Sequence, residues 1–133
     1  MLRKLEVRSR ARSELIDITA LVKEQVRQSA VKNGSCQLLV LHTTAGITVN
    51  EGADPAVRHD IVAFLDRLVP KEAYFTHREG NSDAHIKSTL TGTDLSLLIT
   101  DGALLLGTWQ SIYLCEFDGP RLRQIALKIV PDP

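Results

Sequence analysis

The sequence predicts an α+β protein with a mostly antiparallel sheet system and two or three helices. Residues 3–8 and 124–129 alternate apolar and polar side chains, which is typical of half-buried strands. Residues 36–41 form a short, almost wholly apolar run, as expected of a strand that is buried on both faces. Residues 55–68 carry apolar side chains at helical spacing. Because the last third of the chain reads as successive strands, we expect most of the sheet to be antiparallel.

Length and composition fit one globular domain that spans residues 1–133. The chain has 133 residues, 44% of them apolar, and 16 basic side chains balance 16 acidic ones. A nucleic-acid-binding surface would show as an excess of Lys and Arg, so we expect no nucleic-acid partner. No apolar run approaches the roughly 18–20 residues that a membrane helix needs, so we expect no membrane association.

The first predicted helix runs from about Thr19 to Lys32, with Asp17 or Thr19 as its cap. Its apolar stripe consists of Val22, Val26 and Ala30. The dipeptide Asn33-Gly34 supplies the left-handed stop that commonly ends a helix. A further strand is predicted over residues 43–50, which are rich in β-branched side chains.

The second predicted helix spans residues 55–68 and has the clearest signals. Asp54 stands at the N-cap position and Pro55 at the first helical position, and both residue types are favoured there. The apolar stripe consists of Val57, Ile61, Phe64, Leu65 and Leu68. Pro70 ends the helix, and residues 73–76 are expected to form a short strand.

The C-terminal third is predicted to be a β-meander. Residues 95–100 form a strand, and Asp101-Gly102 is a strong hairpin signal. Residues 104–117 are long enough for one bent strand or two. The turn at residues 118–120 leads into the last strand, residues 124–129.

The two cysteines, Cys36 and Cys115, lie in apolar, strand-like runs. In a domain of this size we expect reduced core thiols rather than a disulfide. Residues 1–15 carry charges throughout and lack the apolar stretch of a secretory signal. Together these observations predict a cytoplasmic protein.

His77 and His85 enclose a polar segment that is expected to be a loop. The segment also holds Glu79, Asn81 and Asp83. Two imidazoles and a carboxylate that converge on one point would make a divalent metal site, with Zn²⁺ preferred. The spacing matches no tight metal signature, so a solvated loop with two unrelated histidines is the alternative.

His42 follows the apolar strand at residues 36–41, at a strand end where binding sites are often built. The alternative is a histidine that is satisfied at a strand edge. His59 falls off the apolar stripe of its helix and is expected to be a solvated surface side chain.

A second polar cluster, Asn50, Glu51 and Asp54, precedes the helix at residues 55–68. These side chains could hold a ligand or orient a histidine, although Asp54 is already explained by capping. Arg121 follows a turn and could clamp a phosphate or carboxylate, or pair with a neighbouring acid. The sequence has no phosphate loop, dinucleotide fingerprint or nucleophile elbow.

These motifs form a set. It comprises His42-Thr-Thr-Ala-Gly-Ile-Thr-Val-Asn-Glu51, Asp54-Pro55, Asp60, His77, Gly80-Asn-Ser-Asp-Ala-His85, Gly107-Thr-Trp-Gln110 and Glu116-Phe-Asp-Gly-Pro-Arg121. Over essentially the whole chain the set resembles the YjbQ-like family, also called secondary thiamine-phosphate synthases. The resemblance implies a β-sandwich-like core, a homotrimer, and a cluster of histidines and acids near a subunit interface. It also implies an activity that joins a pyrimidine diphosphate to a thiazole phosphate, giving thiamine phosphate and pyrophosphate.

The resemblance also implies functional roles for the matching residues of this chain. Metal ligation, by zinc or magnesium, is expected of His42, His77 and His85. Substrate binding is expected of Asn50, Asp54, Asn81 and Arg121. Catalytic roles are expected of Glu51, Asp83 and Arg121. The first hypothesis is therefore a transferase of the thiamine-phosphate synthase type that acts on a phosphorylated small molecule.

Two other functions are compatible with the sequence. The three histidines could hold a metal-bound water in a hydrolase of a small phosphorylated or acyl compound, with Glu51 as general base. Alternatively, the chain could be a non-enzymatic, trimeric small-molecule binder, because no strong catalytic signature is present.

Overall fold

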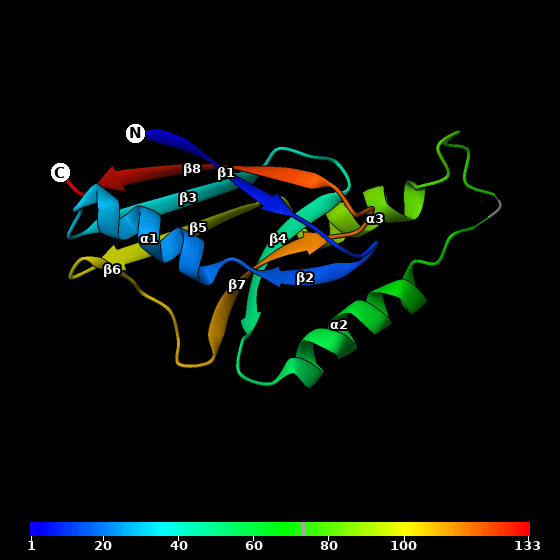
Figure 1. The fold of residues 1–133 in the computed structure, drawn as a ribbon, viewed down its shortest axis with the longest axis horizontal. Helices are drawn as coiled ribbons and strands as arrows, with labels where there is room; N and C mark the ends of the chain where they lie inside the picture. The colour runs from blue at the N-terminus through cyan, green and yellow to red at the C-terminus, as the bar shows by residue number, and fades with distance from the viewer. Residues whose placement is uncertain (73) are drawn as a thin grey trace.

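Antiparallel pairing joins the strands into two sheets, which confirms the predicted α+β class. The structure is a computed structural model, and it describes residues 1–72 and 74–133. Its elements in order are β1 (Leu2–Arg8), β2 (Glu14–Asp17), α1 (Thr19–Ser29), β3 (Gly34–Val40), β4 (Ala45–Glu51), α2 (Pro55–Leu68), α3 (Ser82–Thr91), β5 (Asp94–Thr100), β6 (Ala103–Leu104), β7 (Gln110–Glu116) and β8 (Leu122–Pro131) (Figure 1).

The larger sheet has the strand order β1-β8-β3-β5-β6, and the smaller has the order β2-β7-β4. In β3 the side chains of Cys36, Leu38 and Val40 are buried, whereas Gln37 and Leu39 between them are exposed, so the expectation of a strand buried on both faces is wrong. These residues pack with inward-facing side chains of the smaller sheet, such as Ile47 and Leu114, and with α1. The main core therefore lies between the two sheets, as the expected β-sandwich-like arrangement requires.

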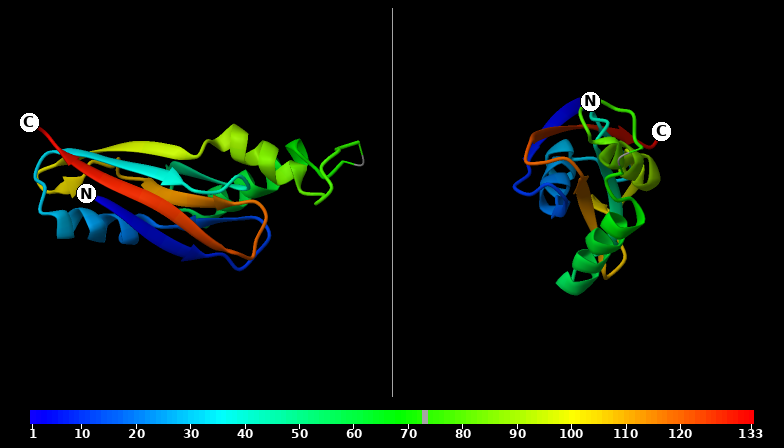
Figure 2. Two further views of the ribbon diagram at one scale, coloured as in Figure 1. Left: turned by 90° about the horizontal axis from the view of Figure 1, so that it is seen from above. Right: turned by 90° about the vertical axis from the view of Figure 1, so that its right-hand side faces the viewer.

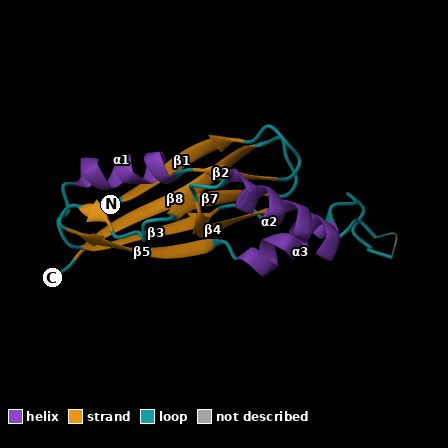
Figure 3. Ribbon diagram, turned by 90° about the horizontal axis from the view of Figure 1, so that it is seen from below, coloured by secondary structure: helices purple, strands orange, loops and turns teal. Residues whose placement is uncertain are grey.

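Strand β7 is buried on both faces because elements cover the smaller sheet from two sides. Ile112 and Leu114 face the main core. Tyr113, Cys115 and Phe117 face a second cluster. That cluster also contains Ala84 of α3 and is bordered by side chains of α2. Helices α2 and α3 lie at one end of the sheets and α1 lies at the other (Figure 3).

The predicted helix over residues 55–68 is confirmed in its bounds and its cap. Asp54 Oδ1 accepts a hydrogen bond of 2.9 Å from the Ala56 amide, and Pro55 is the first helical residue. The apolar stripe is only partly covered, since Phe64 and Leu68 are more than half exposed.

The first predicted helix ends earlier than expected. It stops at Ser29, and Ala30 takes the left-handed conformation with a φ of 58°. The predicted stop at Asn33-Gly34 is wrong because Gly34 is the first residue of β3. A Cβ at Gly34 would lie 2.2 Å from the carbonyl oxygen of Val130, so this glycine permits close strand pairing.

The polar segment 77–85 is a loop only in its first half, and the expectation of a loop throughout is wrong. Helix α3 begins at Ser82 and buries Asp83 and Lys87 together with two small side chains. Its helical pattern was hidden because the buried positions are occupied by charged residues. β2 was not predicted, and residues 74–76 do not form the expected strand, whereas residue 73 lies outside the described residues.

Within the segment 104–117, Leu104 ends the two-residue strand β6, and β7 begins only at Gln110, so the strand expected over this segment is largely confined to its second half. At the hairpin before β6, Asp101 and Gly102 both have positive φ angles, as the turn signal predicted. Cys36 and Cys115 are unbridged and buried, and burial raises their pKa values to about 11 and about 12. In the described part of the chain, every helix is too short or too polar to span a bilayer.

Candidate functional site

One cleft brings together most of the histidines and polar residues that the sequence singled out. Its walls come from the loop after β3, the turn after β7, the start of β8, the loop before α3 and the first turn of α3. The turn between β7 and β8 lies toward the end of the molecule that carries α2 and α3 (Figure 2). The cavity has a volume of about 460 Å³. It is lined by Leu41, His42, Thr43, Thr44, His77, Glu79, Asn81, His85, Asp118, Arg121 and Arg123.

His42 is held by a backbone contact from β8. Its Nε2 accepts a hydrogen bond of 2.8 Å from the Gln124 amide, so the neutral ring carries its proton on Nδ1. Burial lowers the pKa of His42, and the positive charge of Arg123 lowers it further. In its neutral form the ring is therefore a hydrogen-bond donor through Nδ1, and His42 lines the cleft.

His77 and His85 meet across the cleft although eight residues separate them in sequence. Their ring centroids are 5.3 Å apart, and the rings are nearly perpendicular. His85 is fixed by α3, whereas His77 lies in the preceding loop with its Nε2 4.0 Å from Glu79 Oε2. His42, His77 and His85 thus line one cavity. His59 is a surface side chain, as expected, with 81% of it exposed.

Asp118 organises the cationic wall of the cleft. Its Oδ2 accepts hydrogen bonds from Asn81 Nδ2 at 2.7 Å and from Arg121 Nη2 at 3.0 Å. Burial alone would raise the pKa of Asp118, but the bonds from Asn81 and Arg121 outweigh it and the pKa is lowered. Arg121 also donates from Nε to the Asp118 carbonyl at 2.7 Å. Its Nη1 edge is not used by these bonds.

Asn81 adds an unusual feature to this wall. The side chain is 6% exposed, and among the described residues its buried Oδ1 has no hydrogen-bond partner. An unsatisfied buried carbonyl of this kind costs about 1–3 kcal/mol unless water or a ligand donates to it. Among the predicted substrate-binding residues of the described chain, Asn81 is thus the one with a buried polar atom that lacks a hydrogen-bond partner.

Arg123 and Glu116 form a buried ion pair behind the cleft that sequence reasoning missed. Both side chains are at most 3% exposed, and Arg123 Nη2 also donates to Thr44 Oγ1 at 2.9 Å. Ser9 Oγ donates to Glu116 Oε1 at 2.5 Å. Burial would raise the pKa of Glu116, yet bonds from Arg123 and Ser9 lower it. The sequence did contain a signal for this pair. In the alternation of β7, Glu116 falls on the same face as Ile112 and Leu114, and in β8 Arg123 falls on the same face as Ile125, so both charges occupy core positions.

Asp83 is a structural anion in this structure. Its two carboxylate oxygens accept bonds from Arg12 Nη1 at 3.0 Å and Nη2 at 3.2 Å, and its side chain is 2% exposed. Burial would raise the pKa of Asp83, but the Arg12 bonds outweigh it and the pKa is lowered. The carboxylate is absent from the lining of the cleft, so the structure does not bring Asp83 to the histidines.

Asn50, Glu51 and Asp54 lie at the opposite end of β4. Ala45 and Glu51 are the first and last residues of the seven-residue strand β4, and the strand between them is about 20 Å long. Each of the three polar side chains accepts a hydrogen bond from a backbone amide one or two residues further on. Within one chain, the structure therefore does not bring these predicted site residues together with the imidazoles.

The three histidines do not fit a preformed metal centre. Nowhere in residues 1–72 and 74–133 do three or more His, Cys, Asp or Glu side chains converge as metal ligands. His42 uses its Nε2 lone pair to accept the Gln124 amide, and its other nitrogen carries a proton. A metal at His42 would require loss of that contact. His77 and His85 are close enough to share a ligand.

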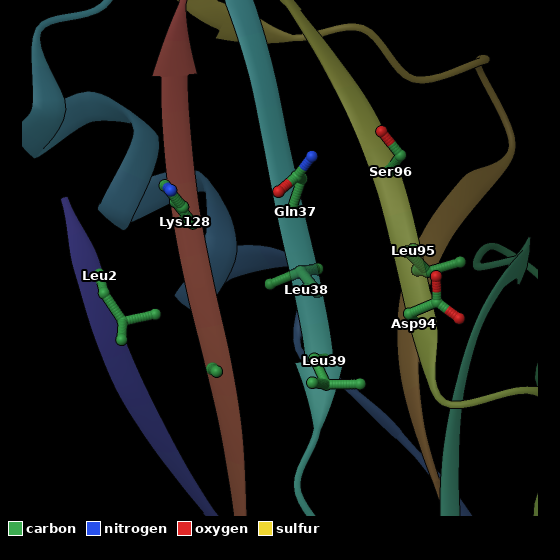
Figure 4. Close-up of a pocket in the computed structure, with 9 residues that line it drawn as sticks. Leu2, Gln37, Leu38, Leu39, Asp94, Leu95, Ser96 and Lys128 are labelled. Atoms are coloured by element: carbon green, nitrogen blue, oxygen red, sulfur yellow. The ribbon is translucent and has the colours of Figure 1, made fainter.

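Two other hollows are largely apolar. One, of about 470 Å³, lies on the outer face of the larger sheet (Figure 4). Leu2, Leu39 and Leu95 lie around it together with Gln37 and Lys128. The second, of about 540 Å³, lies between α2, α3 and β4 and includes Asn50. Neither hollow contains an imidazole.

Comparison with known proteins decides the family. The family model described as UPF0047 protein YjbQ-like matches residues 3–132. The chain belongs to this family. A UPF0047 protein of Methanocaldococcus jannaschii is 53% identical over 99% of this chain and 96% of its own length. The YugU protein of Bacillus subtilis is 42% identical over 98% of this chain and 99% of its own length.

Solved structures of relatives have the same fold. A YjbQ/UPF0047 family protein of Clostridium acetobutylicum has a TM-score of 0.94 at 47% identity, covering 96% of this chain and 99% of that one. A YbjQ-like protein of Sulfolobus solfataricus, described as of unknown function, has a TM-score of 0.94 at 32% identity, covering 99% of this chain and 97% of that one. The fold expected from the resemblance is thereby confirmed, and the activity expected from it is a proposal.

Proposed function

We propose that the imidazole-lined cleft binds a phosphorylated small molecule and that the protein is a transferase of the thiamine-phosphate synthase type. The observation that supports this most directly is that Arg121 and His42 line one cavity, while the Gln124 amide occupies His42 Nε2 and leaves the ring proton on Nδ1. Arginine and neutral imidazole are both donors suited to phosphate oxygens. His77 and His85 add ring N–H donors to the same cavity.

The reaction makes one main demand on the protein. The bond between the pyrimidine's methylene carbon and a diphosphate oxygen breaks, and its electron pair leaves with pyrophosphate. The thiazole nitrogen then supplies the pair for the new carbon–nitrogen bond. Negative charge develops on the leaving group, so fixed donors around it stabilise the transition state. In this proposal Arg121 and His42 supply those donors, and no general base is required.

The remaining residues act by holding the donors in place. Asp118 orients Arg121 through a bond of 3.0 Å. The Gln124 amide fixes the donor tautomer of His42. Asp83, although predicted to be catalytic, would act here as a positioning residue, because it ties α3 to Arg12 and α3 carries His85.

The test is an assay with both substrates that follows thiamine phosphate and pyrophosphate together. Turnover should fall about 100-fold or more in Arg121→Gln and His85→Ala, the scale typical of lost transition-state donors. Arg67→Gln and His59→Ala are the matched controls, since both side chains are exposed on α2. Absence of condensation in the wild-type protein would reject the proposal. Release of phosphate from simple esters would instead favour the hydrolase alternative.

We propose that a divalent metal, if one binds, is held by only two of the three predicted histidine ligands. His77 and His85 could share a zinc ion with ligand oxygens, whereas the acceptor bond of His42 opposes its participation. Zinc titration followed by calorimetry should therefore show binding that is lost in His77→Ala and unchanged in His42→Ala. Stoichiometric zinc that is lost in His42→Ala would restore the predicted three-histidine centre.

The expected homotrimer and cytoplasmic location are also proposals. The outer face of the larger sheet carries exposed leucines, Leu39 at 46% and Leu98 at 58%, and no helix of the described chain covers the part of it that Figure 4 shows. Apolar patches of this kind commonly mark interfaces. Leu98→Glu should reduce the mass measured by light scattering from that of three chains to that of one. Ser96→Glu, on the same face, tests whether any charge there has that effect.

A further inference from the structure

A second chamber adjoins the proposed phosphate cavity and shares lining side chains with it. Its volume is about 610 Å³. His42, Thr43 and His85 line both chambers. The far side of the second chamber is formed by the end of α3 and the start of β5, including Thr89 and Asp94.

The walls of the second chamber are fixed by hydrogen bonds between separate elements. The amide of Val40 donates to the carbonyl of Thr93 at 2.8 Å, which ties β3 to the segment before β5. The amide of Ile47 donates to the Gly92 carbonyl at 3.0 Å. Ser88 Oγ is buried and donates to a backbone carbonyl of β4 at 2.7 Å. The chamber is therefore preformed, as small-molecule sites usually are.

The two chambers differ in charge. The first is lined by Arg121 and Arg123, and these residues are absent from the lining of the second. In the second, Asp94 is the one lining residue with a formal charge when histidines are neutral, and it also borders the hollow on the outer face of the larger sheet (Figure 4). Thr43, Thr89 and Thr93 surround it with hydroxyl groups and methyl groups. A ligand that spans both chambers would place its anionic end beside the arginines and a hydrogen-bond-donating end beside Asp94.

The hydroxyl groups of the second chamber strengthen this polarity. Thr89 Oγ1 donates to the His85 carbonyl at 3.0 Å, so its lone pairs face outward as acceptors. The Asp94 carboxylate is acceptor-only when ionised. The Asp94 carboxylate and the Thr89 hydroxyl therefore offer acceptors on the far wall, which favours a ligand group that carries N–H or O–H donors.

We infer that the second chamber binds the uncharged, amine-bearing portion of the substrate whose phosphate occupies the first chamber, with Asp94 accepting from the amino group. This inference rests on the proposed function and names the part of the substrate that the adjoining chamber recognises. Asp94 is a specificity-determining residue in this arrangement, and His42 and His85 lie where the two portions join.

The experiment compares three probes by calorimetry on the full chain. They are inorganic pyrophosphate, an aminopyrimidine linked through a methylene to diphosphate, and the same compound without its amino group. The wild-type protein should prefer the amino compound about tenfold, which corresponds to about 1.4 kcal/mol. Asp94→Asn should abolish that preference and leave pyrophosphate affinity unchanged. Asp101→Asn, an exposed carboxylate in the distant hairpin, is the matched control.

The outcomes separate this inference from the proposed function. Tight pyrophosphate binding with no amino preference, or with a preference that survives Asp94→Asn, overturns the inference and leaves the proposed function standing. If no diphosphate binds, the proposed function fails. The chamber is then tested with the free aminopyrimidine alcohol, and an affinity that Asp94→Asn does not reduce overturns the inference as well.

Discussion

The two ends of β4 place similar polar residues in different kinds of environment. At the end near His42, the contacts join residues far apart in sequence: His42 meets Gln124, and Asn81 meets Asp118. At the end near Glu51, each polar side chain bonds to a backbone amide within two residues. A polar group with local partners stabilises a turn or a cap, whereas groups held by distant partners converge and can build a site.

The largest expected effect is on stability, and it comes from the buried ion pair of Arg123 and Glu116 near the His42 end of β4. Replacing Arg123 with Met leaves Glu116 charged, buried and without its cation, which typically costs about 3–5 kcal/mol of unfolding free energy. Urea unfolding measures the change. Arg121→Met is the matched control, since half of that side chain is exposed, and it should cost about 1 kcal/mol or less.

If Arg123→Met does not fold, the double variant Glu116→Gln, Arg123→Met keeps the prediction testable. Removing both charges avoids an unpaired buried ion, so the double variant should be more stable than the single one. Equal stability of the two variants would contradict the role assigned to the pair.

The next effect concerns activity and contrasts the two ends directly. His42→Ala should lower the turnover of the condensation assay about 100-fold, because it removes a donor to the leaving group. Glu51→Gln should lower turnover less than about threefold, because Glu51 lies outside the cavity and makes no contact with the leaving group. Loss of such a contact typically costs more than about threefold. A large loss in Glu51→Gln would mean that neighbouring copies in an oligomer bring the two ends of β4 together.

A smaller effect is expected at the cap of α2. Asp54→Ala removes the 2.9 Å bond to the Ala56 amide and should cost about 1 kcal/mol in urea unfolding. Asp54→Ser restores a capping side chain and should recover most of the loss. Since we assign Asp54 to capping, pyrophosphate affinity should be the same in both variants, and weaker binding in Asp54→Ala would contradict that assignment.

The smallest effect is a pH dependence that originates at His42. Its pKa lies below the usual 6.5, so below pH 6.5 the unfolded chain takes up a proton more readily than the folded chain. The stabilising contribution is therefore present above pH 6.5 and is lost as the pH falls through the lower folded-state pKa. Urea midpoints of the wild type should fall more steeply with acidification than those of His42→Gln, whose side chain accepts the same amide without titrating.

Several features of the fold follow from local patterns in the sequence. The stripe of residues 55–68 with Asp54 and Pro55 defined α2 to the residue. The alternation over residues 124–129 identified the strand that became β8. By contrast, α3 was missed because Asp83 and Lys87 fill its buried positions and bond to Arg12 and Asp66. A periodicity based on apolar residues cannot detect a face that is buried through ion pairs.

The sequence by itself determined the α+β class, the bounds of α2 and the histidines worth attention, because hydrophobic periodicity, capping and turn chemistry act over a few residues. Only the tertiary structure decided that His42, His77 and His85 line one cavity and that Glu51 lies at the other end of β4. It also decided that Glu116 pairs with Arg123 in the core. These outcomes depend on how strands pair and where each chain segment ends, and such long-range geometry leaves no periodic trace in the sequence.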